Sequence, residues 1–163
     1  MKRTKIIATI AIAALMLVFA CSVGVKKDLM SGLTTKYNGF TVGDTYLVKD
    51  SKKTTDVKIQ PGKVISLVFA DIGGFTELEG KAYPGASILV TDSKGKTVLD
   101  MADLFTSYDS TGVDVALVKQ ALSIDFTAPA SGFEKGETFT WKSRVWDKKG
   151  KSEITCDLQL ELE

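Results

Sequence analysis

The residues best suited to chemistry in this 163-residue chain are carboxylates and thiols, because the sequence contains no histidine. Without histidine, the chain lacks the commonest general base, the commonest zinc ligand and any serine–histidine or cysteine–histidine pair. One acidic group could converge on a hard cation such as calcium, and it comprises Asp100, Asp103, Asp109 and Asp114. Its spacing does not follow the D-x-D-x-D-G pattern of a calcium loop. The preferred interpretation is solvated loop carboxylates, and no metal or cofactor is predicted.

Trp146 is the candidate binding residue. It follows Val145 and falls out of step with the inward-facing positions of its predicted strand, so its indole should project outward near the end of a hairpin. An exposed indole there could stack on a sugar or a protein partner. The competing interpretation is that Trp146 covers the edge of a sandwich beside Arg144. Trp141 is in register with the core positions and is predicted to be structural.

The charge balance argues against nucleic-acid binding. The chain carries 21 lysines and arginines and 20 aspartates and glutamates, and without the basic residues at positions 2, 3 and 5 the balance is 18 against 20, or −2. Such a charge gives no footprint for a polyanion. No carboxylate pair and no phosphate-binding glycine loop can be singled out either. A binding or structural role is therefore favoured over catalysis.

The amino terminus has the physical parts of a secretory signal. A basic head of Lys2, Arg3 and Lys5 precedes the apolar run of residues 6–20. This run of about fifteen residues is shorter than the roughly 20 that cross a ~30 Å hydrocarbon core. A signal peptide over residues 1–20 is therefore preferred to a permanent transmembrane helix.

The end of the apolar run resembles the lipobox of bacterial lipoproteins, with an aliphatic residue, two residues ending in a small one, and a cysteine. These positions are Val18, Phe19, Ala20 and Cys21. The resemblance implies cleavage after Ala20 and attachment of diacylglycerol to the Cys21 thiol; the alternative is an ordinary thiol behind an ordinary signal. Ser22 stands where an inner-membrane retention signal would place Asp. By the same resemblance the outer membrane is favoured, on its periplasmic face because no acidic residue follows Cys21 closely.

Cys156 has no disulfide partner once Cys21 carries lipid, because the chain has two cysteines. It lies in the segment 154–162, where apolar and polar residues alternate as in a half-buried strand. Cys156 falls on the apolar face of that strand. It is therefore predicted to be a small core residue and not a reactive thiol.

Short β-rich runs separated by turn residues predict an all-β, antiparallel sandwich over residues 39–163. Residues 21–38 mix small, basic and scattered apolar residues without a sustained period, so they are predicted to be a lipidated cysteine and its flexible tether. An irregular or short helical crossover is expected near residues 101–121. The expected strands are 40–48, 57–59, 64–71, 75–78, 87–92, 96–100, 139–145 and 154–162.

The stretch 133–147 resembles the penultimate strand of fibronectin type III and related immunoglobulin-like domains. Phe133 stands three residues before Gly136, Phe139 stands three after it, and alternating positions then lead to Asp147 in a turn. The resemblance implies an immunoglobulin-like sandwich. That architecture serves many unrelated functions, so it bears on the fold alone.

These features together predict a membrane-anchored envelope lipoprotein that is not an enzyme. It would act as a binding or structural module that tethers a protein, peptide or glycan partner and raises its local concentration. The alternative is a carbohydrate-active module, either a sugar-binding module or a glycosidase accessory, which requires Trp146 with Tyr83 or Tyr108 on one exposed platform. A metal-dependent enzyme built on the aspartates ranks third.

Overall fold

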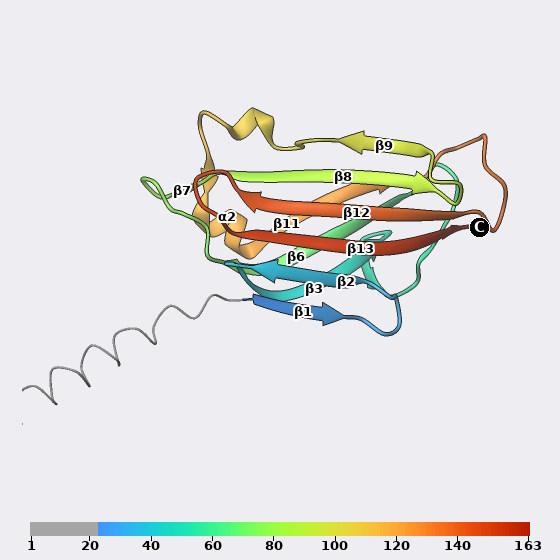
Figure 1. The fold of residues 1–163 in the computed structure, drawn as a ribbon, viewed down its shortest axis with the longest axis horizontal. Coiled ribbons are helices and arrows are strands. Elements are labelled where there is room, and N and C mark those ends of the chain that lie inside the picture. Colours follow the sequence, from blue (N-terminus) through green and yellow to red (C-terminus); the bar gives the residue numbers. More distant parts are fainter. Residues whose placement is uncertain (1–22) are drawn as a thin grey trace, which may run out of the picture.

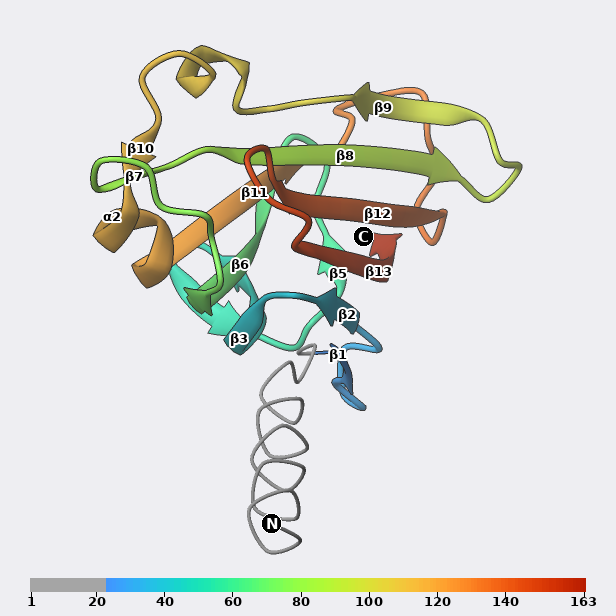
Figure 2. The ribbon, with the colours of Figure 1, turned by 60° about the vertical axis from the view of Figure 1, so that its left-hand side comes forward.

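The computed structural model describes residues 23–163, so the predicted signal peptide and Cys21 lie outside the described residues. In this range two β-sheets face each other around one hydrophobic core (Figures 1 and 2). The prediction of an all-β, antiparallel sandwich is confirmed, and its immunoglobulin-like character stays a prediction. Of the described helices, none is long and apolar enough to span a bilayer.

The larger sheet has the strand order β1-β2-β13-β12-β8-β9, with every neighbouring pair antiparallel. A further short strand, β5, pairs in parallel with the end of β13. The bounds are β1 (Val23–Lys27), β2 (Thr34–Asn38), β5 (Lys58–Ile59), β8 (Pro84–Asp92), β9 (Thr97–Met101), β12 (Thr138–Asp147) and β13 (Glu153–Leu162).

The smaller sheet has the order β11-β6-β3-β4, and two-residue strands β7 and β10 form a separate pair. The bounds are β3 (Thr41–Lys49), β4 (Lys52–Thr54), β6 (Val64–Gly73), β7 (Lys81–Ala82), β10 (Val113–Asp114) and β11 (Ala121–Thr127). The predicted crossover contains a 3-10 helix, Thr106–Tyr108, and one short α-helix, α2 (Val115–Gln120).

The core lies between the sheets, where the alternation of β12 and β13 turns every second side chain inward. Trp141 is 1% exposed, and its ring lies 5.9 Å from that of Phe126 on the opposite sheet. Its indole Nε1 donates a hydrogen bond to Ser143 Oγ at 2.6 Å, so its one polar group is satisfied. Each large apolar side chain buried here stabilises the fold by roughly 1.5–3 kcal/mol.

The strand predicted over residues 75–78 is wrong. Phe75 packs into the core with its ring 4.6 Å from that of Phe40, and only Leu78 makes an isolated bridge, to Lys81. The chain leaves β6 through Gly74, whose φ of 105° suits glycine alone. A single buried aromatic residue, Phe75, accounts for the apolar signal that predicts a strand here.

The flexible tether predicted through residue 38 is also wrong. Residues 23–38 form the β1–β2 hairpin, and β2 pairs with β13, which places β1 at the edge of the larger sheet (Figure 1). Leu33 and Thr35 are buried, and Gly24 packs against the ring of Tyr37. This segment is ordered by backbone hydrogen bonds between β2 and β13, which lies far along the chain. Such pairing does not require a periodic pattern of apolar residues. The sandwich therefore includes residues 23–38 as well as the predicted range 39–163.

A long side chain also ties this hairpin to the other sheet. Lys26 Nζ donates hydrogen bonds to the carbonyl oxygens of Val42, at 2.7 Å, and Gly43, at 3.0 Å, on β3. The ammonium group thus crosses the open side of the sandwich and binds backbone acceptors of the opposite layer. β1 is held by two independent sets of contacts.

Candidate binding surfaces

Trp146 lies on the outer face of β12 and is half-buried. Its cross-strand neighbour is Gly85 on β8, and a Cβ added at that glycine would overlap the indole. The guanidinium carbon of Arg144 lies 5.1 Å from the ring centroid on β12 itself. Arg144 Nε in turn donates to Glu153 Oε2 at 2.9 Å. The indole therefore lies between a backbone surface and a paired cation, on a strand that has a neighbour on each side.

Tyr83 lies at the same end of the β8–β12 strand pair. It stands two residues before Gly85, and its carbonyl oxygen accepts a hydrogen bond from the backbone N–H of Lys148 at 2.9 Å. The Lys149 ammonium lies 4.7 Å from the centroid of its ring. Trp146 and Tyr83 thus share one end of the outer sheet face, each with a cation over its ring.

Tyr108 belongs to the neighbouring crossover. Its side chain is 43% exposed, and its ring lies 6.2 Å from that of Phe105. The structure thus brings the three aromatic residues of the carbohydrate hypothesis to two neighbouring elements, the end of the β8–β12 pair and the crossover. Whether Trp146 binds a ligand stays a prediction.

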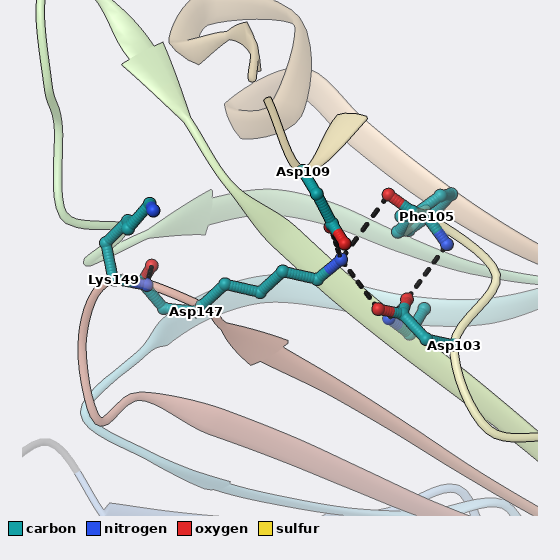
Figure 3. A network of polar contacts seen from close by, with 7 residues as sticks. Asp103, Phe105, Asp109, Asp147 and Lys149 are labelled. Carbon is teal, nitrogen blue, oxygen red and sulfur yellow. Dashed lines mark hydrogen bonds and ion pairs between the residues drawn. The ribbon is translucent and has the colours of Figure 1, made fainter. Parts of the chain in front are cut away.

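Two of the four aspartates converge, and the group on which they converge is a lysine (Figure 3). Lys148 Nζ lies 2.6 Å from Asp103 Oδ2 and also pairs with Asp109 Oδ1. Asp103 Oδ1 accepts from the backbone N–H groups of Phe105, at 2.9 Å, and Ala86, at 3.3 Å. The cation of this site is therefore an ammonium carried by the β12–β13 turn.

The other two aspartates have separate positions. Asp100 is exposed on β9, and Asp114 caps α2 by accepting a hydrogen bond from the backbone N–H of Ala116 at 2.9 Å. Within residues 23–163, no group of three or more metal-ligating side chains could hold an ion.

The pairing at Lys148 shifts the pKa of both of its more buried members. Burial alone would raise the pKa of Asp103, but the hydrogen bonds from Lys148, Phe105 and Ala86 outweigh it and hold that pKa below its ordinary value. Burial alone would lower the pKa of Lys148, but its hydrogen bonds to Asp103 and Asp109 raise it above the ordinary value. Both groups are charged at neutral pH, so the cluster fastens the crossover to the hairpin turn.

Cys156 lies on the buried face of β13, as predicted, and is 2% exposed. Its Sγ is 3.3 Å from Thr35 Oγ1 on β2. Burial raises the pKa of the thiol to about 12, and the hydrogen bond to Thr35 offsets only part of that effect. A thiol in this state is a poor nucleophile at neutral pH.

A cavity of about 590 Å³ opens at the other end of the sandwich, between the β8–β9 turn and the loop before β12. Its lining mixes both signs of charge, and it includes Asp92, Lys94, Lys96, Glu134, Lys135 and Glu137. Sequence analysis did not single it out, because its two walls come from loops about 40 residues apart. The mixed lining favours no one class of ligand.

The exposed apolar residues of the first hairpin were not predicted from the sequence. Val23 and Val25 on β1, with Leu29 and Met30 in the following turn, are all exposed. The only signal in the sequence was the scattered apolar residues of the segment that is predicted to be a tether.

Comparison with known proteins gives a likeness of shape alone. No protein-family model matches the chain, and no curated protein matches it. Among solved structures, the crystal structure of the C-terminal domain of wzt is similar, with 8% sequence identity and a TM-score of 0.49 over 87% of this chain and 78% of that one. The chain is an antiparallel β-sandwich, and its function must be argued from its own residues.

Proposed function

We propose that the protein is a lipid-anchored module of the bacterial cell envelope, without catalytic activity, that holds a protein, peptide or glycan partner near the membrane. Val18, Phe19, Ala20 and Cys21 resemble the lipobox pattern, and β1 begins at Val23, two residues after the cysteine. That closeness of cysteine and sandwich is the observation that carries the proposal. A diacylated cysteine with a third acyl chain would anchor such a domain stably, since each buried CH2 contributes ~0.8 kcal/mol.

The sheet topology suggests which side of the module meets the partner. β1 and β9 are opposite edges of the larger sheet (Figure 1). With the anchor next to β1, the strand β9 and the crossover that follows it would point away from the bilayer. β9 also leaves one row of backbone groups without a strand partner, which is the arrangement that accepts an added strand.

The anchor is tested by labelling with radioactive palmitate in the bacterial host. Wild-type protein should take up label and fractionate with membranes, and Cys21→Ser should do neither. Cys156→Ala is the matched control, because it removes the other cysteine from a buried position and should keep the label. Undiminished labelling and membrane partition of Cys21→Ser would refute the anchor.

The partner side is tested by photo-crosslinking in intact envelopes. A crosslinking amino acid at Asp100, on the exposed edge β9, should give a defined adduct that disappears in Cys21→Ser. The same amino acid at Gln159, exposed in the middle of the sheet, is the control position. Equal adducts from both positions would speak against a role for the β9 edge.

A carbohydrate-active module is the second candidate, favoured by the placement of Trp146 and Tyr83 at one end of the sheet. Stacking on a sugar would require the Arg144 side chain to move from the Trp146 ring. A glycan array should then show binding that Trp146→Ala abolishes and Trp146→Phe weakens. Absence of any glycan bound by wild-type protein would eliminate this candidate.

A further inference from the structure

The exposed large apolar residues of the described chain gather at one edge. Nine such residues occur in residues 23–163, and four of them lie within the first eight positions: Val23, Val25, Leu29 and Met30, exposed by 69%, 66%, 87% and 81%. The other five are scattered over the rest of the sandwich: Val64, Leu78, Met101, Tyr108 and Leu117. Single exposed apolar side chains are ordinary, but four on one strand and its turn form a patch that favours an interaction.

This apolar edge lies next to the proposed anchor without slack. Only Ser22 separates Cys21 from Val23, and two residues span at most about 7 Å. β1 cannot swing freely from that point, because it pairs along its length with β2 and Lys26 binds two carbonyl groups of β3. A lipid on Cys21 would therefore hold the first residue of β1 at the phospholipid headgroups, and an orientation with β1 along the membrane surface brings the rest of the edge to the same depth.

The charge of the edge suits that surface. The first two strands and their turn carry three lysines and one acid, Asp28. The Lys26 ammonium binds carbonyl groups of β3, so Lys27 and Lys36, which are both exposed, are the lysines that can contact headgroups. The Asp28 carboxylate is hydrogen-bonded within its own turn, since its Oδ1 accepts from the backbone N–H groups of Met30, at 2.7 Å, and Ser31, at 3.2 Å. Lys36 is the cross-strand neighbour of Val25, so apolar and basic side chains alternate on the outer face. Anionic headgroups attract such lysines, while the apolar side chains enter the interface.

We propose that β1 and the β1–β2 turn, residues 23–33, dock on the phospholipid bilayer that carries the acylated Cys21. The inference rests on the proposed lipid anchor and adds to it a fixed orientation. Leu29 and Met30 insert at the interface, Lys27 and Lys36 contact headgroups, and the larger sheet stands with β9 outermost. Five interstrand spacings of ~4.8 Å separate the two edges, so β9 lies about 24 Å further from the bilayer than β1.

The experiment measures depth at two methionines in the acylated full-length protein. Met30→Cys in the turn and Met101→Cys on β9 are each labelled with an environment-sensitive fluorophore and reconstituted into phosphatidylethanolamine and phosphatidylglycerol vesicles. Met101 is the matched control, because it is an exposed methionine at the opposite edge of the same sheet. Cys21 carries lipid and the Cys156 thiol is buried, so neither takes the label.

The expected result is that aqueous iodide quenches the Met30 label about threefold or more weakly than the Met101 label, and that spin-labelled lipids quench it more strongly. Leu29→Asp with a label at Val25→Cys should restore iodide access while the protein still floats with the vesicles. If the protein floats with the vesicles and iodide quenches the labels at positions 30 and 101 equally, the docking is overturned and the lipid anchor still holds. Protein that does not float overturns both.

A protein partner is distinguished by repeating the measurement in native envelopes. Protection of Met30 in envelopes together with full access in vesicles would assign the edge to a protein and overturn the bilayer as its occupant. Equal protection in both preparations supports the bilayer.

Discussion

The two tryptophans of β12 are five residues apart and stand on opposite faces of the same strand. Trp141 faces inward, is 1% exposed, and contacts an aromatic ring of the other sheet. Trp146 faces outward and lies between Gly85 and Arg144. The indole of Trp141 fills space in the core between the two sheets. The indole of Trp146 is held on the outer face by its contacts with Gly85 and Arg144. Trp141 therefore stabilises the fold, whereas Trp146 contributes less to stability and keeps part of its ring accessible.

The largest expected effect is that of Trp141→Ala, which should lower the free energy of unfolding by about 3–5 kcal/mol, because it leaves a cavity in the core. It also leaves the buried Ser143 hydroxyl without its donor. Trp146→Ala, the matched control, should cost about 1 kcal/mol. Urea denaturation followed by circular dichroism measures both, and equal losses would contradict the distinction between the two faces.

Lys148→Met should come next, at about 1–2 kcal/mol at pH 7, because it removes the cation between Asp103 and Asp109. The Asp103 pKa lies below its ordinary value of 3.8, so this contribution is present above that value and is lost as the pH falls through the lowered pKa. The Lys148 pKa lies above 10.5, so its contribution is present below 10.5 and is lost as the pH rises through the raised pKa.

The difference in stability between wild type and Lys148→Met should therefore be largest between about pH 5 and pH 9, and should shrink outside that range. Urea titrations at a series of pH values measure it. Lys149→Met, at the next position, is the control and should show a smaller loss without this pH profile. A pH-independent difference for Lys148→Met would show that the charge of Lys148 is not what stabilises the turn.

Gly85→Ala should cost about 1 kcal/mol, because the added methyl group overlaps the Trp146 ring and the indole must move toward solvent. The same substitution in a Trp146→Ala background should cost little, so a double-mutant cycle isolates the contact. Ser87→Ala, the next outward position on β8, is the control. Equal costs of Gly85→Ala in both backgrounds would place the strain in the backbone.

The smallest effect belongs to Arg144→Ala, at about 0.5 kcal/mol, because its pair with Glu153 is half exposed and well screened. The Arg144→Ala substitution is more informative as a spectroscopic probe. Removal of the cation should shift the fluorescence emission of Trp146, which is measured in a Trp141→Phe background. Lys142→Ala, an exposed residue of the same strand face that is not on the ring, should leave the emission unchanged.

The alternation of apolar residues predicted β12, β13 and the core role of Cys156, because each strand buries one face against a large volume. It could not predict β1 and β2. The inward positions of β1 are Gly24 and Lys26, so this edge strand buries little and shows no period. β1 is ordered by pairing with β2, which in turn pairs with β13. Edge strands are specified by their neighbours, which a local pattern does not contain.

The candidate site shows the same limit. The aspartates stood out in the sequence, but Lys148 lies about 40 residues away and belongs to a different element. The outward direction of Trp146 followed from strand parity, whereas the glycine under its ring and the cation above it depend on the register of β8 and on side-chain direction. The face to which a strand residue points follows from its position in the strand, whereas the residue opposite it depends on how two distant strands pair.

The position of β1 also has a mechanical consequence. A pull between an anchor at Cys21 and a partner on β9 acts across the strands, so it would open the β1–β2 pairs one after another, starting at Val23 and Asn38. The two hydrogen bonds of Lys26 would resist the fourth step, after the pairs of Val23, Gly24 and Val25 have opened. Peeling of residues 23–33 would add about 11 residues, or roughly 36 Å of reach, while β2 and the rest of the sandwich stay folded. The first hairpin would then serve as an extensible element that lengthens under tension and re-forms when the load is removed.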